Sequence, residues 1–173
     1  MYSLVSGIIH EIVDRSISKS SLLVLGIDGA GKTTLIDKIM QLAIPNRRPK
    51  TIMQTLGLNT DNINEGKISL RIWDLGGKKD FRGIWYKYMP NATALIYVVN
   101  GKQEDRIHES RKLFDEITCS FTNSIVLVFL EADESILNLF PSADRAEKIF
   151  FIDITKDEEI RLLYNWMKST AKK

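Results

Sequence analysis

The chain has 173 residues, a length that suits one domain with a substantial hydrophobic core. Hydrophobic residues make up 44% of it and charged residues 27%, which are ordinary values for a globular protein. The 24 basic and 22 acidic side chains leave a net charge of +2, so the composition supports neither a nucleic-acid ligand nor a strongly acidic partner.

Cysteine and histidine are scarce. Cys119 is the only cysteine, which excludes an internal disulfide, and His10 and His108 are too far apart in sequence to form a zinc cluster. A reducing, cytoplasmic location fits best. We also expect the protein to be a monomer. No apolar run approaches the roughly 18 residues of a transmembrane helix, and no signal peptide is evident. Tyr2 stands where N-myristoylation demands glycine and the chain ends without a cysteine to prenylate, so we expect no encoded lipid anchor.

Residues 4–17 have apolar side chains at the spacing of one helical stripe, with charged side chains opposite. The apolar members are Leu4, Val5, Ile8, Ile9, Ile12, Val13 and Ile17. We assign residues 1–18 to an amphipathic helix separate from the main domain. Such a helix can lie on a membrane surface, although its polar face carries both charge signs and attracts anionic lipid little. Docking on its own domain or on a partner fits the pattern equally well.

Residues 26–34 fit the pattern G-x-x-x-x-G-K-[ST] of a phosphate-binding loop. The apolar run at residues 22–25 predicts a buried strand before the loop, and residues 35–42 predict a helix after it. Glycines let successive backbone N–H groups point at phosphate oxygens, and the helix N-terminus adds its positive dipole. We expect Lys32 to reach the β- and γ-phosphates and the Thr33 hydroxyl to bind Mg²⁺.

A proline-bracketed break at residues 45–50 ends this helix and begins a loop. Residues 55–62 are expected to be extended, residues 64–67 to turn, and residues 68–73 to form a strand of alternating apolar and polar side chains. Two strands joined by such a tight turn must be antiparallel.

Strand and helix patterns alternate through the rest of the chain. They predict buried strands at 94–99, 125–130 and 149–154, helices at 104–117 and 157–169, and a short helical region at 135–146. The inward-facing helical residues are expected to be Ile107, Leu113, Phe114, Ile117, Ile160, Leu163, Trp166 and Met167. Such alternation indicates parallel strands covered on both faces. We therefore predict an α/β fold of the phosphate-loop class at residues 19–173: a six-stranded, mostly parallel sheet with one antiparallel edge strand and helices on both faces.

A second motif, Trp-Asp-Leu-Gly-Gly at residues 73–77, ends the third predicted strand. In a nucleotide-binding fold, an Asp at the carboxyl end of a strand can bind Mg²⁺ through water. A glycine just after it can offer its N–H to the γ-phosphate. Asp74 and Gly77 occupy these two positions.

The phosphate loop, Thr55 with Gly57, and the string at 73–77 followed by Trp85 and Tyr88 together resemble the Arf and Arf-like branch of the Ras-type small GTPases. The resemblance extends from residue 20 to the last helix, and the Trp-Asp-x-Gly-Gly string is much more specific than the phosphate loop. It implies a molecular switch in vesicle transport that binds GTP or GDP with Mg²⁺. In relatives of this kind, the hairpin between two switch segments slides along the sheet when GTP replaces GDP and expels the N-terminal helix.

The same resemblance implies which residues form the site. Nucleotide contacts are expected at Asp28, Gly29, Ala30, Gly31, Lys32, Thr33, Thr34, Thr55, Gly77, Asp133 and Ile154. Metal ligands are expected at Thr33, Thr55 and, through water, Asp74. The catalytic positions are Lys32, Thr55, Gly77 and Lys78, of which the last is altered.

Partners are implied in the same way. Residues 4–17 are expected to contact a membrane surface, so the protein would be peripheral on an intracellular membrane. Exchange factors, activating proteins and effectors would bind the switch segments, of which residues 75–88 are the second, and an apolar patch. That patch comprises Leu58, Trp73 and Tyr88, with leucine where the family usually has phenylalanine. Ordinary core packing is the alternative role for Trp73.

Lys78 departs from the family pattern because it replaces the glutamine that orients the attacking water. Lysine has no acceptor for a proton of that water, so we expect slow GTP hydrolysis. The alternative is that Lys78 points into solvent and a partner supplies the missing group.

The base-reading segment departs further. Where the family has Asn-Lys-x-Asp, this chain has residues 130–133, with Leu130 for Asn, Glu131 for Lys and Asp133 for Asp. A shift by one residue would place Glu134 at the Asp position instead. The last base-contacting loop corresponds to residues 153–155, where the backbone N–H of Ile154 is still available for guanine O6. Each missing buried hydrogen bond removes about 1 kcal/mol or more, so affinity and guanine selectivity are both in question.

Three functions fit these observations. The first is an Arf-like GTP-binding switch with weak GTPase activity. The second is a binding module that holds nucleotide without hydrolysing it. The third, a small nucleotide kinase, is the weakest because the sequence has no arginine-rich lid segment.

Overall fold

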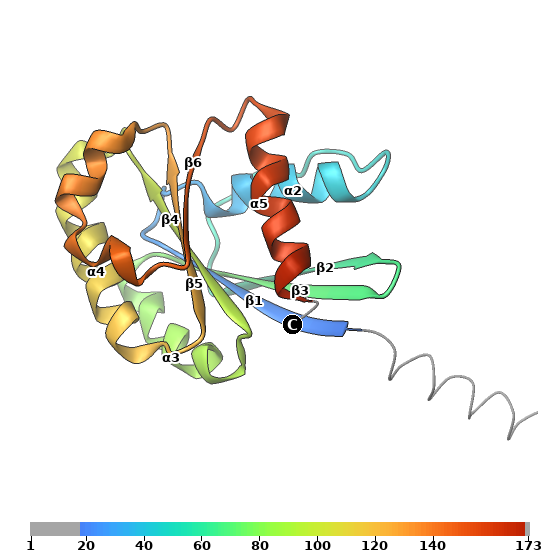
Figure 1. Cartoon of the computed structure of the whole chain (residues 1–173), viewed down its shortest axis with the longest axis horizontal. Helices are drawn as coiled ribbons and strands as arrows, with labels where there is room; N and C mark the ends of the chain where they lie inside the picture. Colours follow the sequence, from blue (N-terminus) through green and yellow to red (C-terminus); the bar gives the residue numbers. More distant parts are fainter. Residues whose placement is uncertain (1–17, 172–173) are drawn as a thin grey trace, which may run out of the picture.

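A computed structural model describes residues 18–171, so the helix predicted at residues 4–17 lies outside the described part of the chain. One sheet runs through this part, with helices on both faces (Figure 1). Its strands are β1 (Ser18–Leu25), β2 (Leu58–Glu65), β3 (Ile68–Leu75), β4 (Ala94–Asn100), β5 (Ser124–Leu130) and β6 (Lys148–Ile152). The α-helices are α2 (Lys32–Ala43), α3 (Trp85–Tyr88), α4 (Ile107–Ser120) and α5 (Asp157–Thr170).

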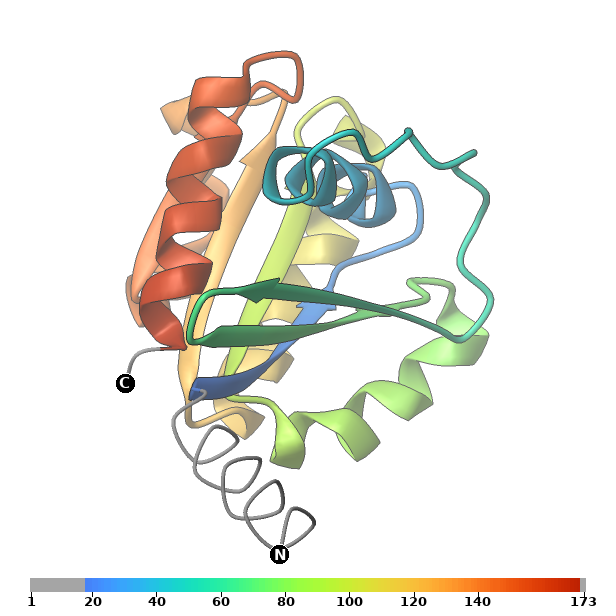
Figure 2. The same cartoon turned by 90° about the vertical axis from the view of Figure 1, so that its right-hand side faces the viewer.

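The sheet has six strands in the order β2-β3-β1-β4-β5-β6. The hairpin of β2 and β3 is antiparallel and every other neighbouring pair is parallel, which confirms the predicted fold class. Figure 2 views the molecule from the side of this hairpin. In the register of β1 with β3, Val24 lies beside Asp74, so the carboxyl ends of these strands meet.

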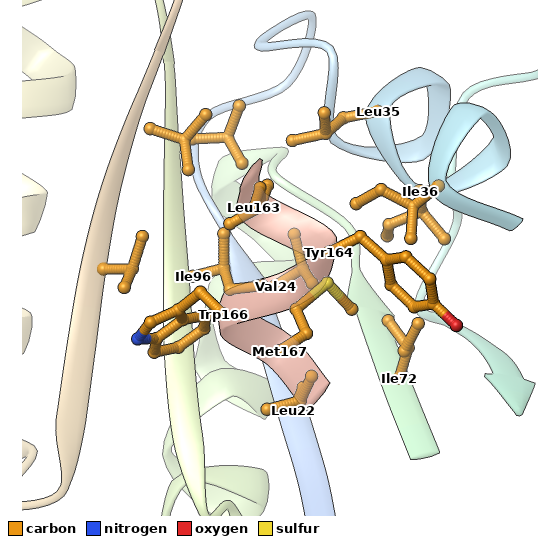
Figure 3. Packing of buried hydrophobic residues seen from close by; sticks show 14 of the residues in the cluster. Leu22, Val24, Leu35, Ile36, Ile72, Ile96, Leu163, Tyr164, Trp166 and Met167 are labelled. Atoms are coloured by element: carbon orange, nitrogen blue, oxygen red, sulfur yellow. The ribbon is translucent and has the colours of Figure 1, made fainter. Parts of the chain in front are cut away.

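The central strands are apolar on both faces because helices cover both. Leu22 and Val24 belong to the cluster beneath α2 and α5, whereas Leu23 and Leu25 belong to the cluster beneath α3 and α4. Successive strand residues point to opposite faces, so a strand covered on both sides needs an unbroken apolar run. Figure 3 shows the first cluster, in which α5 lays Leu163 and its neighbours against the sheet.

The inward-facing residues predicted on α4 and α5 are all buried except Leu113. Leu113 is half-buried and packs against both clusters. Tyr164, which the pattern did not select, is also buried.

Short 3₁₀ helices connect the main elements. They lie at Lys79–Ile84, Met89–Asn91, Glu104–Arg106, Glu134–Leu139 and Pro141–Arg145. The predicted helical region at 135–146 is therefore two 3₁₀ helices, which meet at Pro141, a residue with no N–H to continue the first one. The predicted helix at 104–117 likewise begins as a 3₁₀ turn and becomes α-helical at Ile107.

The last strand ends at Ile152, two residues earlier than predicted. Asp153 ends it by forming a tight turn, in which its Oδ1 accepts hydrogen bonds from the N and Oγ1 atoms of Thr155. Ile154 is thereby placed in the loop before α5. Among the helices of residues 18–171, none combines the length and apolar character needed to span a bilayer.

Candidate functional site

The loop at residues 26–31 joins β1 to α2, and its backbone passes very close to β4. Gly26 has a φ of 144°, and a Cβ atom there would lie 2.3 Å from the carbonyl oxygen of Val98. Any side chain would therefore collide with the neighbouring strand, and the positive φ also favours glycine. Gly31 ends the loop in a left-handed conformation immediately before α2. The loop thus delivers Lys32 and Thr33 at the first turn of a helix.

Lys32 folds back into this loop. Its Nζ atom donates hydrogen bonds of 2.9 Å to the carbonyl oxygens of Gly26 and Ile27, and only 6% of the residue is exposed. Burial lowers the pKa of Lys32 to about 8, against the opposing effect of the carboxylates of Asp74 and Asp28. The ammonium group is thus held inside the loop by neutral acceptors, where a phosphate would supply the missing negative charge.

Three oxygen-bearing side chains from separate segments converge beside the loop. The Asp74 Oδ2 atom accepts hydrogen bonds from the hydroxyls of Thr33, at 2.6 Å, and Thr55, at 3.2 Å. The two hydroxyl oxygens lie 3.0 Å apart. The other carboxylate oxygen of Asp74, Oδ1, is buried without a hydrogen-bond partner among residues 18–171.

This cluster fits a magnesium ion that is shared with phosphate. Mg²⁺ prefers oxygen ligands and usually takes one or two from the protein, with substrate phosphates and water completing its octahedron. Within residues 18–171, no group of three or more histidine, cysteine, aspartate or glutamate side chains could hold a metal by itself. A metal at Asp74 therefore requires hydroxyl, water and phosphate oxygens.

The start of the segment after β3 packs directly on the phosphate loop. A Cβ atom at Gly77 would lie 2.3 Å from the backbone N of Asp28, and Gly76 donates its N–H to the carbonyl oxygen of Gly57. The indole N–H of Trp85 donates to the Gly76 carbonyl at 3.0 Å. These contacts place the Gly77 backbone at the wall of a cavity of about 280 Å³.

Most of the residues predicted to bind phosphate line this cavity. The predicted residues in its lining are Asp28, Gly29, Gly31, Lys32, Thr33, Thr34, Thr55 and Gly77. Ala30 is buried beneath the loop rather than in the lining. Lys78 is exposed, and its backbone carbonyl oxygen accepts a hydrogen bond from the Phe81 N–H.

A charged network that sequence reasoning missed surrounds Asp28. Arg106 donates to both carboxylate oxygens and the carbonyl oxygen of Asp28, and Arg106 also pairs with Glu109. Arg82 donates to Glu109 at 2.7 Å and to the Gly77 carbonyl at 2.8 Å. The hydrogen bonds from Arg106 hold the pKa of Asp28 below its usual range.

One sequence signal could have revealed this network. Arg106 lies a few residues after β4, and β4 neighbours β1 in the sheet. Loops that follow neighbouring parallel strands meet at the same edge, so the loop after β4 had to contact the phosphate loop.

The residues predicted to read the base lie on two other loops. Asp133 is exposed, and its Oδ1 accepts a hydrogen bond from the N–H of Ser135 at the start of the helix Glu134–Leu139. Asp133, Asp153 and Ala132 line a cavity of about 680 Å³ between the loops after β5 and β6. Ile154 is half-buried and is not part of this lining.

Leu130 and Glu131, the two residues that depart from the family's base motif, lie beside the phosphate loop and at a bend, respectively. Leu130 reaches toward the phosphate loop, since a Cβ atom on Gly31 would lie 2.7 Å from its Cδ1. Glu131 adopts a left-handed φ of 53°, which is rare for a residue with a side chain. Its carboxylate pairs with Lys102 at 2.7 Å.

The three residues of the predicted apolar patch are all half-buried. Trp73 and Tyr88 pack edge to face with ring centroids 5.3 Å apart, and Leu58 lies with them against the cluster beneath α3 and α4. They combine partial exposure with core packing, so their arrangement is compatible with both roles considered from the sequence.

Comparisons with known proteins agree with this geometry. Residues 6–165 match the sequence model of Arf, the ADP-ribosylation factor family. The chain is 32% identical to ADP-ribosylation factor-related protein 1 of Rattus norvegicus over 123 residues, which are 69% of this chain and 60% of the relative. It is 29% identical to ADP-ribosylation factor 3 of Arabidopsis thaliana over 167 residues, which are 89% of each.

A solved structure shows the same fold. The Arl6 BBS3 small GTPase of Trypanosoma brucei, with the bound nucleotide analogue GppNp, aligns with a TM-score of 0.71 at 21% sequence identity. The alignment covers 89% of this chain and 98% of that one.

The close approach of Gly77 to the phosphate loop predicts a specific cost of substitution. Gly77→Ala should lower the free energy of unfolding by about 1–3 kcal/mol, because the methyl group meets backbone atoms that cannot rotate away. Gly83→Ala is the matched control, since a Cβ atom at Gly83 has open space around it and should change stability by less than about 0.5 kcal/mol. Urea unfolding measures both free energies, and equal stabilities of the two variants would contradict the close packing of Gly77 on the phosphate loop.

Proposed function

Because this chain belongs to the ADP-ribosylation factor family, we propose that it is a guanine-nucleotide switch that binds GTP or GDP with Mg²⁺ and hydrolyses GTP slowly. Residues 19–173 form the nucleotide-binding domain in this proposal, and residues 1–18 form a separate helix. The observation that carries the proposal is the convergence of Thr33, Thr55 and Asp74 beside the buried ammonium of Lys32.

The phosphates are assigned to the cavity next to the loop. The backbone N–H groups of residues 28–34 and the positive end of α2 supply donors for phosphate oxygens, and Lys32 supplies the charge. Gly77 offers its N–H to a γ-phosphate. The geometry supports these roles because all of these residues except Ala30 line one cavity.

The metal ligands are assigned to Thr33 and Thr55, with Asp74 acting through water. Mg²⁺ bound there would neutralise charge on the β- and γ-phosphate oxygens. Thr55 belongs to a loop, whereas Thr33 and Asp74 belong to a helix and a strand. Such a site can therefore respond to the γ-phosphate by ordering or releasing the loop.

The base is assigned to Asp133, which would accept the guanine N1–H and N2–H groups, and to the Ile154 N–H, which would donate to O6. Leu130 and Glu131 replace the asparagine and lysine of the family pattern, so the amide and the ammonium of those residues are lost. We therefore propose weaker selectivity for guanine than the family pattern implies. Glu134 is the alternative base reader.

Slow hydrolysis is assigned to Lys78. Its exposed ammonium can donate hydrogen bonds but cannot accept one from the attacking water, so it cannot replace the glutamine. A non-hydrolysing nucleotide-binding module is the second candidate, and the same observation favours it.

The biological setting is proposed from the family and from residues 4–17. We assign the protein to vesicle transport, as a cytoplasmic protein that binds peripherally to a membrane through this segment. Exchange factors, activating proteins and effectors would bind the switch segments and the patch of Leu58, Trp73 and Tyr88.

Nucleotide content tests the proposal directly. Protein purified without added nucleotide and then denatured should release about one GDP or GTP per chain, and Lys32→Met should release much less because the loop loses its phosphate charge. Chromatography of the released nucleotide measures both. Recovery of adenine nucleotide alone would contradict the assignment to guanine.

The role of Lys78 predicts a gain of activity. Lys78→Gln should raise the single-turnover rate of γ-phosphate release by roughly tenfold or more, since glutamine can hold the attacking water. Lys79→Gln, which changes the adjacent exposed lysine, is the control and should leave the rate unchanged. An unchanged rate in Lys78→Gln would show that another feature limits hydrolysis.

Membrane binding through the N-terminal segment predicts a difference in flotation. The full chain should float with phosphatidylcholine vesicles when loaded with a non-hydrolysable GTP analogue, whereas a chain lacking residues 1–17 should stay in the dense fraction. Equal flotation of the two proteins would refute the anchor.

A further inference from the structure

The segment that carries Thr55 is held by charged residues at both of its ends. Lys50 lies just before the segment and Asp61 lies on β2 after it. The Lys50 Nζ atom is 2.9 Å from Asp61 Oδ1 and 3.1 Å from Oδ2. Arg47 adds a hydrogen bond of 3.1 Å from Nη2 to the same Oδ1 atom. The chain between residues 50 and 61 is thereby closed into a loop at its base.

Asp37 on α2 ties the same base to the helix. Its Oδ2 atom accepts hydrogen bonds from the backbone N–H of Lys50 at 3.2 Å and from the Gln41 amide at 2.6 Å. The Arg47 Nε atom lies 3.9 Å from Asp37 Oδ1. Asp37 is 5% exposed, so these contacts occur largely out of solvent. We call Asp37, Arg47, Lys50 and Asp61 the loop clamp.

The clamp differs from an ordinary surface ion pair. The side chains of Asp61 and Arg47 are only 14% and 17% exposed, whereas the side chain of Lys50 is 50% exposed. Burial by itself would raise the pKa of Asp61, but the hydrogen bonds from Lys50 and Arg47 outweigh it and hold the pKa below its usual range. Charge-assisted contacts that are partly shielded from water contribute more than exposed pairs do.

The segment inside the clamp has little else to hold it. Residues 51–57 form no helix and no strand, and the side chains of Ile52, Met53 and Leu56 are exposed. Apolar packing therefore contributes little to its order. Its other hydrogen bonds join the Thr55 hydroxyl to Asp74 and to the Thr33 hydroxyl, and the Gly57 carbonyl to the Gly76 N–H. The Asn59 amide also donates to Thr55 Oγ1 at 3.1 Å.

We propose that the loop clamp positions Thr55 beside Thr33 and Asp74, where the metal is assigned. The clamp thereby sets how much more tightly the protein binds a nucleoside triphosphate than a diphosphate. This inference rests on the proposed assignment of Thr55 to Mg²⁺. Tying the two ends of a loop removes many of its open conformations, which reduces the entropy lost when Thr55 binds. A triphosphate needs Thr55 in place and a diphosphate does not, so the clamp favours the triphosphate state.

Two variants test the clamp. Lys50→Met removes the exposed cation and Asp61→Asn removes the shared carboxylate charge. Arg48→Met is the matched control, because Arg48 lies in the same stretch, is exposed and makes no hydrogen bond or ion pair with the described residues. Lys50→Arg keeps the charge and should behave as the native protein does.

Nucleotide release is the first measurement. Fluorescent GppNHp and GDP are released into excess unlabelled nucleotide at several free Mg²⁺ concentrations. Each clamp variant should release the triphosphate analogue about tenfold faster than the native protein and release GDP at nearly the native rate. The clamp variants should also need more Mg²⁺ to slow the release of GppNHp. Equal acceleration for both nucleotides would mean that the residues are merely structural and would overturn the proposal.

Limited proteolysis is the second measurement and needs no nucleotide. Chymotrypsin should cut the clamp variants within residues 51–57 faster than it cuts the native protein and Arg48→Met, while their melting temperatures stay close to native. Unchanged cleavage would overturn the clamp even if the native protein binds GTP. If the clamp variants are cleaved faster and the native protein yields no guanine nucleotide on denaturation, the clamp is supported and the proposed function is refuted.

Discussion

A single buried carboxylate links the parts of this protein that form the site. Asp74 is 2% exposed, and one of its oxygens accepts hydrogen bonds from Thr33 on α2 and from Thr55 in the loop before β2. Burying a charge is costly unless it is paired or hydrogen-bonded, so this position needs polar partners or a cation. The register of β1 and β3 sets Asp74 beside Val24, just before the phosphate loop, and thus determines which partners it meets.

Two ionic networks hold the loops that contribute to this site. The network of Asp28, Arg106, Glu109 and Arg82 ties the phosphate loop to α4 and to the segment after β3. The loop clamp ties the segment before β2 to α2 and to β2. The loop clamp acts on a segment whose apolar side chains, Ile52, Met53 and Leu56, are exposed, so electrostatic contacts supply the order there that hydrophobic packing supplies elsewhere.

The cavity assigned to the phosphates and the cavity assigned to the base differ in character. Lys32, Thr33 and the glycines form a compact cavity with converging donors. At the other end, Glu131 takes a left-handed conformation and pairs with Lys102, and Asp133 caps a short helix. The larger cavity there is bordered by several carboxylates and one lysine, Lys156. Under the proposed function, these differences mean that affinity for nucleotide would come mainly from the phosphates.

The sequence by itself determined the elements whose signals are local. Apolar runs, turn residues and the loop motif were sufficient to predict the six strands, the antiparallel hairpin, α2, α4 and α5, because strand and helix periodicity and glycine geometry act over a few neighbours.

Only the tertiary structure decided which polar groups meet. Arg106 reaches Asp28 and Lys50 reaches Asp61 through contacts between segments, and charged side chains show no periodicity that identifies a distant partner. The half-burial of Trp73 was likewise decided by its packing against Tyr88. Partner choice depends on strand order and register, and these are set by the packing of the whole sheet.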